Sequence, residues 1–159
     1  SGPLLCNFNQ FYKVVPEIWD LWMTILQSST TATLWLLAWS AVGKASLEKY
    51  ADTAGVGRGR LAFSTFFEER WHVAAKGVCD LFLDNVPYSA HGTAADALFT
   101  GLPILTVPGQ PMASRVSTSL AFASPLGSTL AARSLDDYLS IAKRLARPEA
   151  LPYLAAIRD

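Results

Sequence analysis

Short apolar runs alternate along this chain with segments in which apolar residues recur every three or four positions. The short runs predict strands over 4–8, 33–38, 60–64, 78–83 and 103–107, and their nearly continuous apolar character is typical of strands covered on both faces. The helical spacing predicts helices over 16–27, 46–54, 68–76, 93–100, 113–121, 134–146 and 149–158. Strands and helices in alternation are the pattern of successive βαβ units.

Proline and glycine mark the ends of several predicted helices. Pro16 suits a first helical turn, where its missing N–H leaves no hydrogen bond unmade. Gly55, Gly77 and Gly101 each follow a helical segment and favour its termination. Because βαβ crossovers are right-handed and lay helices over a parallel sheet, we predict an α/β protein with a Rossmann-like open parallel sheet and helices on both faces.

Composition narrows the possible functions. The 159 residues are 51% hydrophobic and 16% charged, which is enough for one domain over 1–159 with its own core. A formal net charge of +0 offers no clustered cations for a polyphosphate backbone or an anionic bilayer, so neither nucleic acid nor a membrane is expected as a partner.

The chain carries no obvious targeting segment. No stretch reaches the roughly 18 apolar residues of a membrane span, and no signal peptide pattern opens the sequence. We expect a soluble intracellular protein with free thiols at Cys6 and Cys79. Since the chain starts without Met and stops inside a helical pattern, we also expect it to be a piece of a longer polypeptide.

The residues that could bind a ligand or take part in catalysis lie at the carboxyl ends of the predicted strands, where open parallel sheets bind ligands. Gln10 and Lys13 follow the first strand, and a lysine ammonium there can neutralise a phosphate that gains charge as it leaves. Taken alone, Lys13 fits a solvated surface lysine better. Small residues at 89–95 follow the fourth strand and open a helix, where free N–H groups form an anion site and Thr93 adds a hydroxyl. Asp96, one turn along, can accept hydrogen bonds from a ribose diol, whereas the plain alternative is an N-capped helix packed on the sheet.

The residues that follow the other predicted strands give weaker indications of a function. His72 lies one turn into the helix after the third strand, and taken by itself it fits a packing role better than ligand binding. Residues 39–43, after the second strand, read as an ordinary turn. Arg115, after the fifth, is either a ligand contact or an ion-pair partner. The glycine-rich 55–59 follows a helix rather than a strand, so a dinucleotide oxidoreductase is disfavoured.

Several stretches together resemble one family over nearly the whole chain. They look like the C-terminal half of the catalytic region of the protein O-linked N-acetylglucosamine transferases, glycosyltransferase family 41, and less like the related plant-type protein O-fucosyltransferases. The stretches are Phe8-Asn9-Gln10-Phe11-Tyr12-Lys13, Leu34-Trp35-Leu36-Leu37, Ala41-Val42-Gly43, His72, Leu83-Asp84, His91-x-Thr93-x-x-Asp96-x-Leu98, Gly101-x-Pro103 and Pro108-Gly109-x-x-x-Ala113-Ser114-Arg115-Val116.

The resemblance implies the nucleotide-binding lobe of a two-lobed GT-B enzyme that transfers N-acetylglucosamine, with inversion, from UDP-N-acetylglucosamine to Ser or Thr hydroxyls of cytoplasmic or nuclear proteins. It implies no metal and no cofactor, in keeping with the lack of a clustered Asp or His ligand set. An N-terminal catalytic lobe and a TPR array for protein substrates are the implied partners. The implied roles are diphosphate binding by Gln10 and Lys13, catalysis by Lys13, uracil and ribose contact by His72, donor sugar contact by His91, phosphate binding by Gly92 and Thr93 at the helix start, and ribose binding by Asp96.

Three positions depart from the family pattern: Glu69 stands where a lysine is usual, Ala75 where an arginine is usual with Lys76 as an imperfect substitute, and Gly92 where a threonine is usual. Each lost charge-assisted bond is worth roughly 1.5–3 kcal/mol, so weaker donor binding is expected. Two hypotheses stay open: a transferase lobe active only when joined to its other half, and a diverged nucleotide-binding or interaction module without chemistry.

Overall fold

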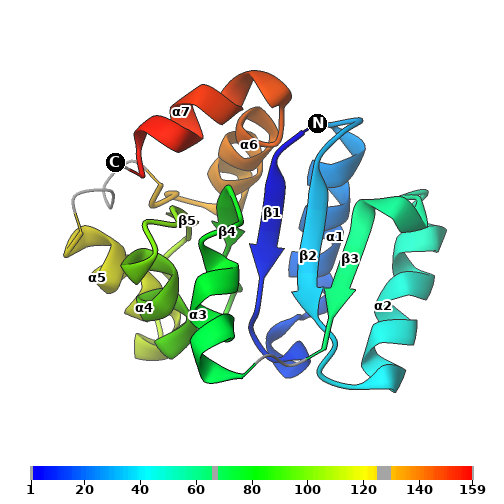
Figure 1. The fold of residues 1–159 in the computed structure, drawn as a ribbon, viewed down its shortest axis with the longest axis horizontal. Coiled ribbons are helices and arrows are strands. Elements are labelled where there is room, and N and C mark those ends of the chain that lie inside the picture. The colour runs from blue at the N-terminus through cyan, green and yellow to red at the C-terminus, as the bar shows by residue number, and fades with distance from the viewer. Residues whose placement is uncertain (1, 66–67, 125–129, 159) are drawn as a thin grey trace.

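The computed structural model describes residues 2–65, 68–124 and 130–158 and shows one open parallel sheet (Figure 1). The strands are β1 (Leu4–Asn7), β2 (Thr33–Leu37), β3 (Leu61–Ser64), β4 (Leu81–Leu83) and β5 (Ile104–Leu105). They lie in the order β3-β2-β1-β4-β5 with parallel pairing throughout. The predicted α/β class is confirmed.

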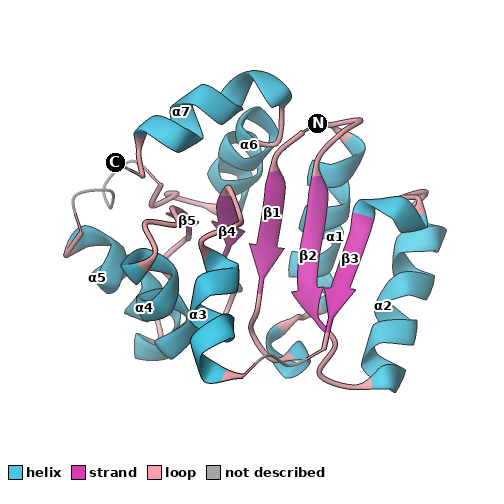
Figure 2. Cartoon of the chain, in the orientation of Figure 1, coloured by secondary structure: helices cyan, strands magenta, loops and turns pink. Residues whose placement is uncertain are grey.

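Helices cover both faces of the sheet (Figure 2). The helices are α1 (Pro16–Gln27), α2 (Ala41–Thr53), α3 (Glu69–Lys76), α4 (Gly92–Phe99), α5 (Val116–Phe122), α6 (Leu135–Leu145) and α7 (Leu151–Ala156). Short 3-10 turns occur at η1 (Phe11–Lys13), η2 (Arg58–Arg60), η3 (Met112–Ser114) and η4 (Pro148–Ala150). Within the described ranges, no helix is long and apolar enough to cross a membrane.

Two buried clusters follow from the alternation of side chains along each strand. Leu5, Leu81 and Leu83 point to the face where α1, α6 and α7 pack, and they belong to the larger cluster. Cys6 follows Leu5, and Phe82 lies between Leu81 and Leu83, so both point to the opposite face, which α4 covers. Consecutive strand residues are therefore apolar because each face has its own helical layer to fill.

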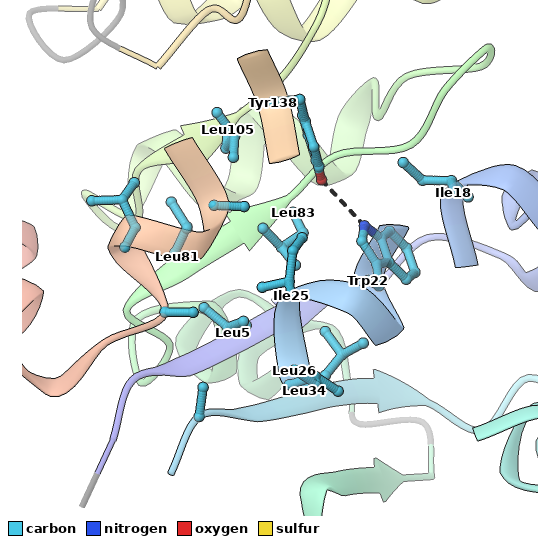
Figure 3. Close-up of a cluster of buried hydrophobic side chains, with 14 of the residues drawn as sticks. Leu5, Ile18, Trp22, Ile25, Leu26, Leu34, Leu81, Leu83, Leu105 and Tyr138 are labelled. Atoms are coloured by element: carbon cyan, nitrogen blue, oxygen red, sulfur yellow. Dashed lines mark hydrogen bonds between the residues drawn. The ribbon is translucent and has the colours of Figure 1, made fainter. Parts of the chain in front are cut away.

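Two linked hydrogen bonds cross the larger cluster, and Figure 3 shows the first of them, between Trp22 and Tyr138. Trp22 of α1 donates through Nε1 to the hydroxyl of Tyr138 on α6 at 3.2 Å, and that hydroxyl donates to the Asp84 carbonyl at 3.1 Å. Both side chains have no exposed surface. Because the Trp22 indole N–H and the Tyr138 hydroxyl both have partners, neither donor is buried unpaired, and α1 and α6 together hold the backbone directly after β4.

Some predicted boundaries were wrong for local reasons. Helix α2 begins at Ala41 rather than at 46, because Ser40 caps it and accepts a hydrogen bond from the Gly43 N–H at 3.0 Å. Strand β4 covers only the last part of 78–83, since turn hydrogen bonds from the N–H groups of Val78 and Cys79 prolong the end of α3. The chain over 113–121 begins as a 3-10 turn before α5.

Candidate functional site

The strand order identifies the carboxyl ends of β1 and β4 as the place where a ligand is expected. From β1 the chain proceeds to β2 and β3 on one side of the sheet, and then to β4 and β5 on the other. The point where the order reverses, between β1 and β4, is where open α/β sheets leave a crevice for a ligand. The glycine-rich 55–59, in contrast, connects α2 to β3 at the opposite edge of the sheet.

Lys13 lies at these strand ends, as the last residue of η1. Its side chain is 9% exposed, and Nζ donates a hydrogen bond to the Ser89 carbonyl at 3.1 Å. The same nitrogen lies 3.8 Å from the centre of the Tyr88 ring, a cation–π contact. Burial lowers the pKa of Lys13, and the charge of Asp84 opposes this shift. The structure thus brings the lysine that follows β1 to the loop that leads from β4 into α4.

An asparagine amide joins the two strand ends. The Oδ1 atom of Asn85 accepts hydrogen bonds from the side-chain amides of Asn7 and Asn9, each at 2.6 Å. Its Nδ2 donates to the Lys13 carbonyl at 3.0 Å. These contacts hold η1 against the loop after β4. Sequence reasoning missed Asn7 and Asn85, although an asparagine near the carboxyl end of each of two strands was the available signal.

A buried carboxylate shapes the loop between β4 and α4. Asp84 has no exposed surface, and its Oδ1 accepts hydrogen bonds from the backbone N–H groups of Ala90 at 2.7 Å and Asn85 at 2.9 Å. Its Oδ2 accepts from the Thr106 hydroxyl at 2.8 Å. Burial raises the pKa of Asp84, and these hydrogen bonds counteract the rise. The loop is folded around this carboxylate, which fixes where α4 starts.

The start of α4 presents backbone donors. In the described part of the chain, the N–H groups of Gly92 and Thr93 have no hydrogen-bond partner, whereas those of Ala94 and Ala95 donate to the His91 carbonyl. Unpaired N–H groups and the helix dipole make such a start favourable for an anion. A Cβ placed on Gly92 would meet nothing within 4 Å, so the open space extends to this residue.

His91 caps this helix and is held by two neighbours. Its Nε2 lies 3.2 Å from the Ala113 carbonyl, and its ring packs edge-on against Tyr88 with 5.0 Å between ring centres. Because a carbonyl oxygen can only accept, Nε2 carries the hydrogen in this contact. Nδ1, the other ring nitrogen, makes no hydrogen bond to a described residue.

A second group of side chains joins α3 to α4. Lys76 of α3 has no exposed surface, and its Nζ lies 3.1 Å from Oδ2 of Asp96 on α4. Nζ also donates to the His72 carbonyl at 3.2 Å. The His72 ring lies 6.2 Å from the Phe8 ring, centre to centre. Burial and the Lys76 charge lower the pKa of His72, and Asp96 opposes them.

Other residues predicted to belong to the site make fewer contacts with the described residues. Gln10 is exposed, and its side chain makes no hydrogen bond to any described residue. Arg115 is exposed and forms no ion pair with a described residue, so the ion-pair interpretation is not supported in that part of the chain. The side chain of Glu69 lies outside what the structure describes. Among the described residues, no group of three or more His, Cys, Asp or Glu is arranged to hold a metal ion.

Fold and site together define a class of protein. An open parallel sheet with a buried lysine and a helix start at its point of reversal is a Rossmann-like domain, of the kind that holds a nucleotide there. The model of glycosyl transferase family 41 matches residues 3–159. The chain belongs to this family, and the resemblance found in the sequence is confirmed.

Individual relatives agree with this assignment. The chain is 37% identical over 142 residues to a Caenorhabditis elegans UDP-N-acetylglucosamine–peptide N-acetylglucosaminyltransferase, covering 89% of this chain and 12% of the relative. It is 35% identical over 139 residues to the Arabidopsis thaliana protein SEC, described as a probable enzyme of the same activity, covering 87% of this chain and 14% of that protein.

A solved structure agrees as well. A Thermobaculum terrenum O-GlcNAc transferase mutant has a TM-score of 0.90 and 31% identity to the chain, covering 99% of this chain and 30% of that one. The predicted Rossmann-like lobe therefore corresponds to part of a known O-GlcNAc transferase. The chain spans only a small part of the length of each of these relatives.

Proposed function

We propose that this chain is the donor-binding lobe of a protein O-GlcNAc transferase, which binds UDP-N-acetylglucosamine for transfer of the sugar to Ser or Thr hydroxyls. The observation that carries the proposal is the packing of the Lys13 ammonium against the loop that opens α4. Membership of family 41 and the names of two relatives at 35–37% identity support the same activity. No observation favours the protein O-fucosyltransferase alternative.

In the proposed complex, the diphosphate lies at the start of α4. The N–H groups of Gly92 and Thr93 donate to phosphate oxygens, the Thr93 hydroxyl adds a donor, and Lys13 supplies a full positive charge. Gln10 is exposed at the same edge and is free to donate from its amide. Because Lys13 is largely buried, its charge is poorly screened by water and acts more strongly on a phosphate.

The transfer is a single displacement with inversion. The acceptor oxygen attacks the anomeric carbon, the bond from that carbon to the phosphate oxygen breaks, and the electron pair stays on UDP. The negative charge that develops on the leaving phosphate is stabilised by Lys13 and by the helix start, so their effect is greatest in the transition state. The hydroxyl proton passes to a base outside this chain, in the second lobe.

The remaining side chains position the donor. His72 lies beside the base and ribose, and its lowered pKa keeps the ring neutral at pH 7. Asp96 accepts hydrogen bonds from the ribose, and Nδ1 of His91 faces the donor sugar. We further propose that transfer needs no metal, because Lys13 and the helix start supply the charge that a cation would. Activity of the full-length enzyme should then survive EDTA.

The partners follow from the same proposal. Protein Ser and Thr side chains are the acceptors, and an N-terminal catalytic lobe of the same polypeptide, with TPR repeats, completes the enzyme in the cytoplasm or nucleus. The relatives are much longer than this chain, which leaves room for these parts.

Calorimetric titration of the protein with UDP and with GDP tests the proposal. We expect binding of UDP and clear selectivity over GDP, because the base and ribose lie between α3 and α4. Absence of binding by either nucleotide would contradict the proposal and favour the alternative of a diverged module that keeps the sheet without the chemistry.

A further inference from the structure

The buried lysine at the end of α3 is a feature that the proposed binding roles leave unexplained. Lysine is almost never fully buried unless it is paired, because removing its charge from water is costly. Lys76 has no exposed surface, and the cation is compensated by Asp96 across 3.1 Å and by the His72 carbonyl at 3.2 Å. Its Nζ also lies 6.0 Å from the centre of the Phe8 ring. Two of these neighbours, His72 and Asp96, are the residues proposed to contact the nucleoside.

The ion pair is one-sided. The Lys76 side chain is 0% exposed, whereas the Asp96 side chain is 39% exposed. The lysine therefore holds the carboxylate from the interior and contacts Oδ2 alone. In the described part of the chain, Oδ1 of Asp96 has no hydrogen-bond partner. A carboxylate held in this way offers one oxygen to a ligand at a fixed orientation.

The position of Asp96 on α4 relates this oxygen to the proposed phosphate site. Asp96 lies three residues after Thr93, and residues three apart are neighbours on one face of a helix. A helix rises about 1.5 Å per residue, so the Cα atom of Asp96 lies about 4.5 Å along the axis from that of Thr93, and its side chain leans back toward the helix start. That separation suits the sugar attached directly to the bound phosphate.

We propose that Lys76 is a positioning residue that orients the Asp96 carboxylate toward the ribose diol and so makes the site selective for ribonucleoside diphosphates over their 2′-deoxy forms. The inference rests on the proposed function. The competing explanation is that Lys76 only fastens α3 to α4. A purely structural role weakens binding of both nucleotides equally, whereas a positioning role changes their ratio.

The experiment measures Kd for UDP and for 2′-deoxy-UDP by calorimetry. The variants are Lys76→Met, Asp96→Asn and the double variant, with thermal melting as a check on folding. Met keeps the unbranched shape of lysine without its charge, and Lys76→Gln serves as a second variant if Lys76→Met does not fold. Lys143→Met is the matched control, because it removes a lysine charge on α6, which packs on the other face of the sheet.

We expect the original protein to prefer UDP by about tenfold or more, the range for a hydrogen bond to a charged group. In Lys76→Met and in Asp96→Asn the preference should fall to about threefold or less, and the double variant should lose nothing further, because Lys76 acts through Asp96. Lys143→Met should keep the full preference.

Two results would overturn the inference while leaving the proposed function intact. One is UDP binding without any preference over the deoxy form in the original protein. The other is an unchanged preference in the Lys76 variants, with both affinities reduced equally. If the original protein binds no UDP, the proposed function fails, and this inference fails with it.

Discussion

Replacing Gly92 by threonine should strengthen donor binding. Gly92 is the first residue of α4 and is exposed, and a Cβ at this position would meet nothing within 4 Å. The Cβ of an added side chain therefore fits without moving any neighbour. The threonine places a second hydroxyl beside that of Thr93, where the diphosphate is proposed to lie.

The magnitude follows from the charge of the acceptor. A hydrogen bond to a charged group contributes about 1.5–3 kcal/mol, and ordering the new side chain consumes part of that. A net gain of about 1.4 kcal/mol corresponds to a tenfold lower Kd. Threonine is also a better helix former than glycine, so the free energy of unfolding should rise by no more than about 0.5 kcal/mol.

Calorimetric titration with UDP checks this prediction, and Gly92→Val supplies the control. Valine matches threonine in shape and β-branching but lacks the hydroxyl, so it reproduces the backbone and packing effects alone. We expect Gly92→Thr to bind UDP about tenfold more tightly than Gly92→Val. Equal affinities in two folded variants would refute the placement of phosphate at this helix start.

Three further predictions concern the same crevice. In the full-length enzyme, Lys13→Ala should lower kcat by about a hundredfold or more and change the donor Kd much less, because the extra charge develops on the phosphate only during transfer. Steady-state kinetics together with a separate measurement of Kd checks this prediction, and an unchanged kcat would contradict it. Asp84→Asn should lower the free energy of unfolding by about 2 kcal/mol, because one amide oxygen cannot accept from three donors. An unchanged midpoint of urea unfolding in this variant would be evidence against the role of Asp84 in holding the loop. The pKa of His72 is lowered in the folded protein, so the unfolded chain binds the proton more readily. The free energy of unfolding should therefore be unaffected by His72 above its unfolded pKa of about 6.5 and should decrease as the pH falls below that value. Urea unfolding at pH 7.5 and at pH 5.5 should show a smaller decrease in His72→Gln than in the original protein.

The sheet could be predicted from the sequence because its signals are local. Strands β1, β2, β4 and β5 are apolar runs with buried residues on both faces, and the partly buried edge strand β3 is also mostly apolar, so each can be recognised without knowledge of its neighbours. The start of α2 was missed because Ser40 lies within a run of small and apolar residues that reads as a turn, and only the capping hydrogen bond to Gly43 distinguishes it.

The site was only partly predictable for the opposite reason. That Lys13 meets the loop after β4 could be anticipated, because parallel strands end at the same edge of the sheet. The pairing of Lys76 with Asp96 joins two helices, and the amide contacts of Asn85 join two strand ends. Such contacts depend on which elements are adjacent and on where each side chain points, and neither is recorded in periodicity or spacing.

The amide of Asn85 has a consequence for how quickly a donor binds. It bridges the ends of β1 and β4 through three hydrogen bonds, two of them 2.6 Å long, and all three partners belong to the protein itself. The conformational entropy of the segments after β1 and β4 is therefore lost during folding and not when UDP binds. Association with UDP should then follow a single exponential whose rate rises linearly with nucleotide concentration, without the plateau that a slow rearrangement would impose.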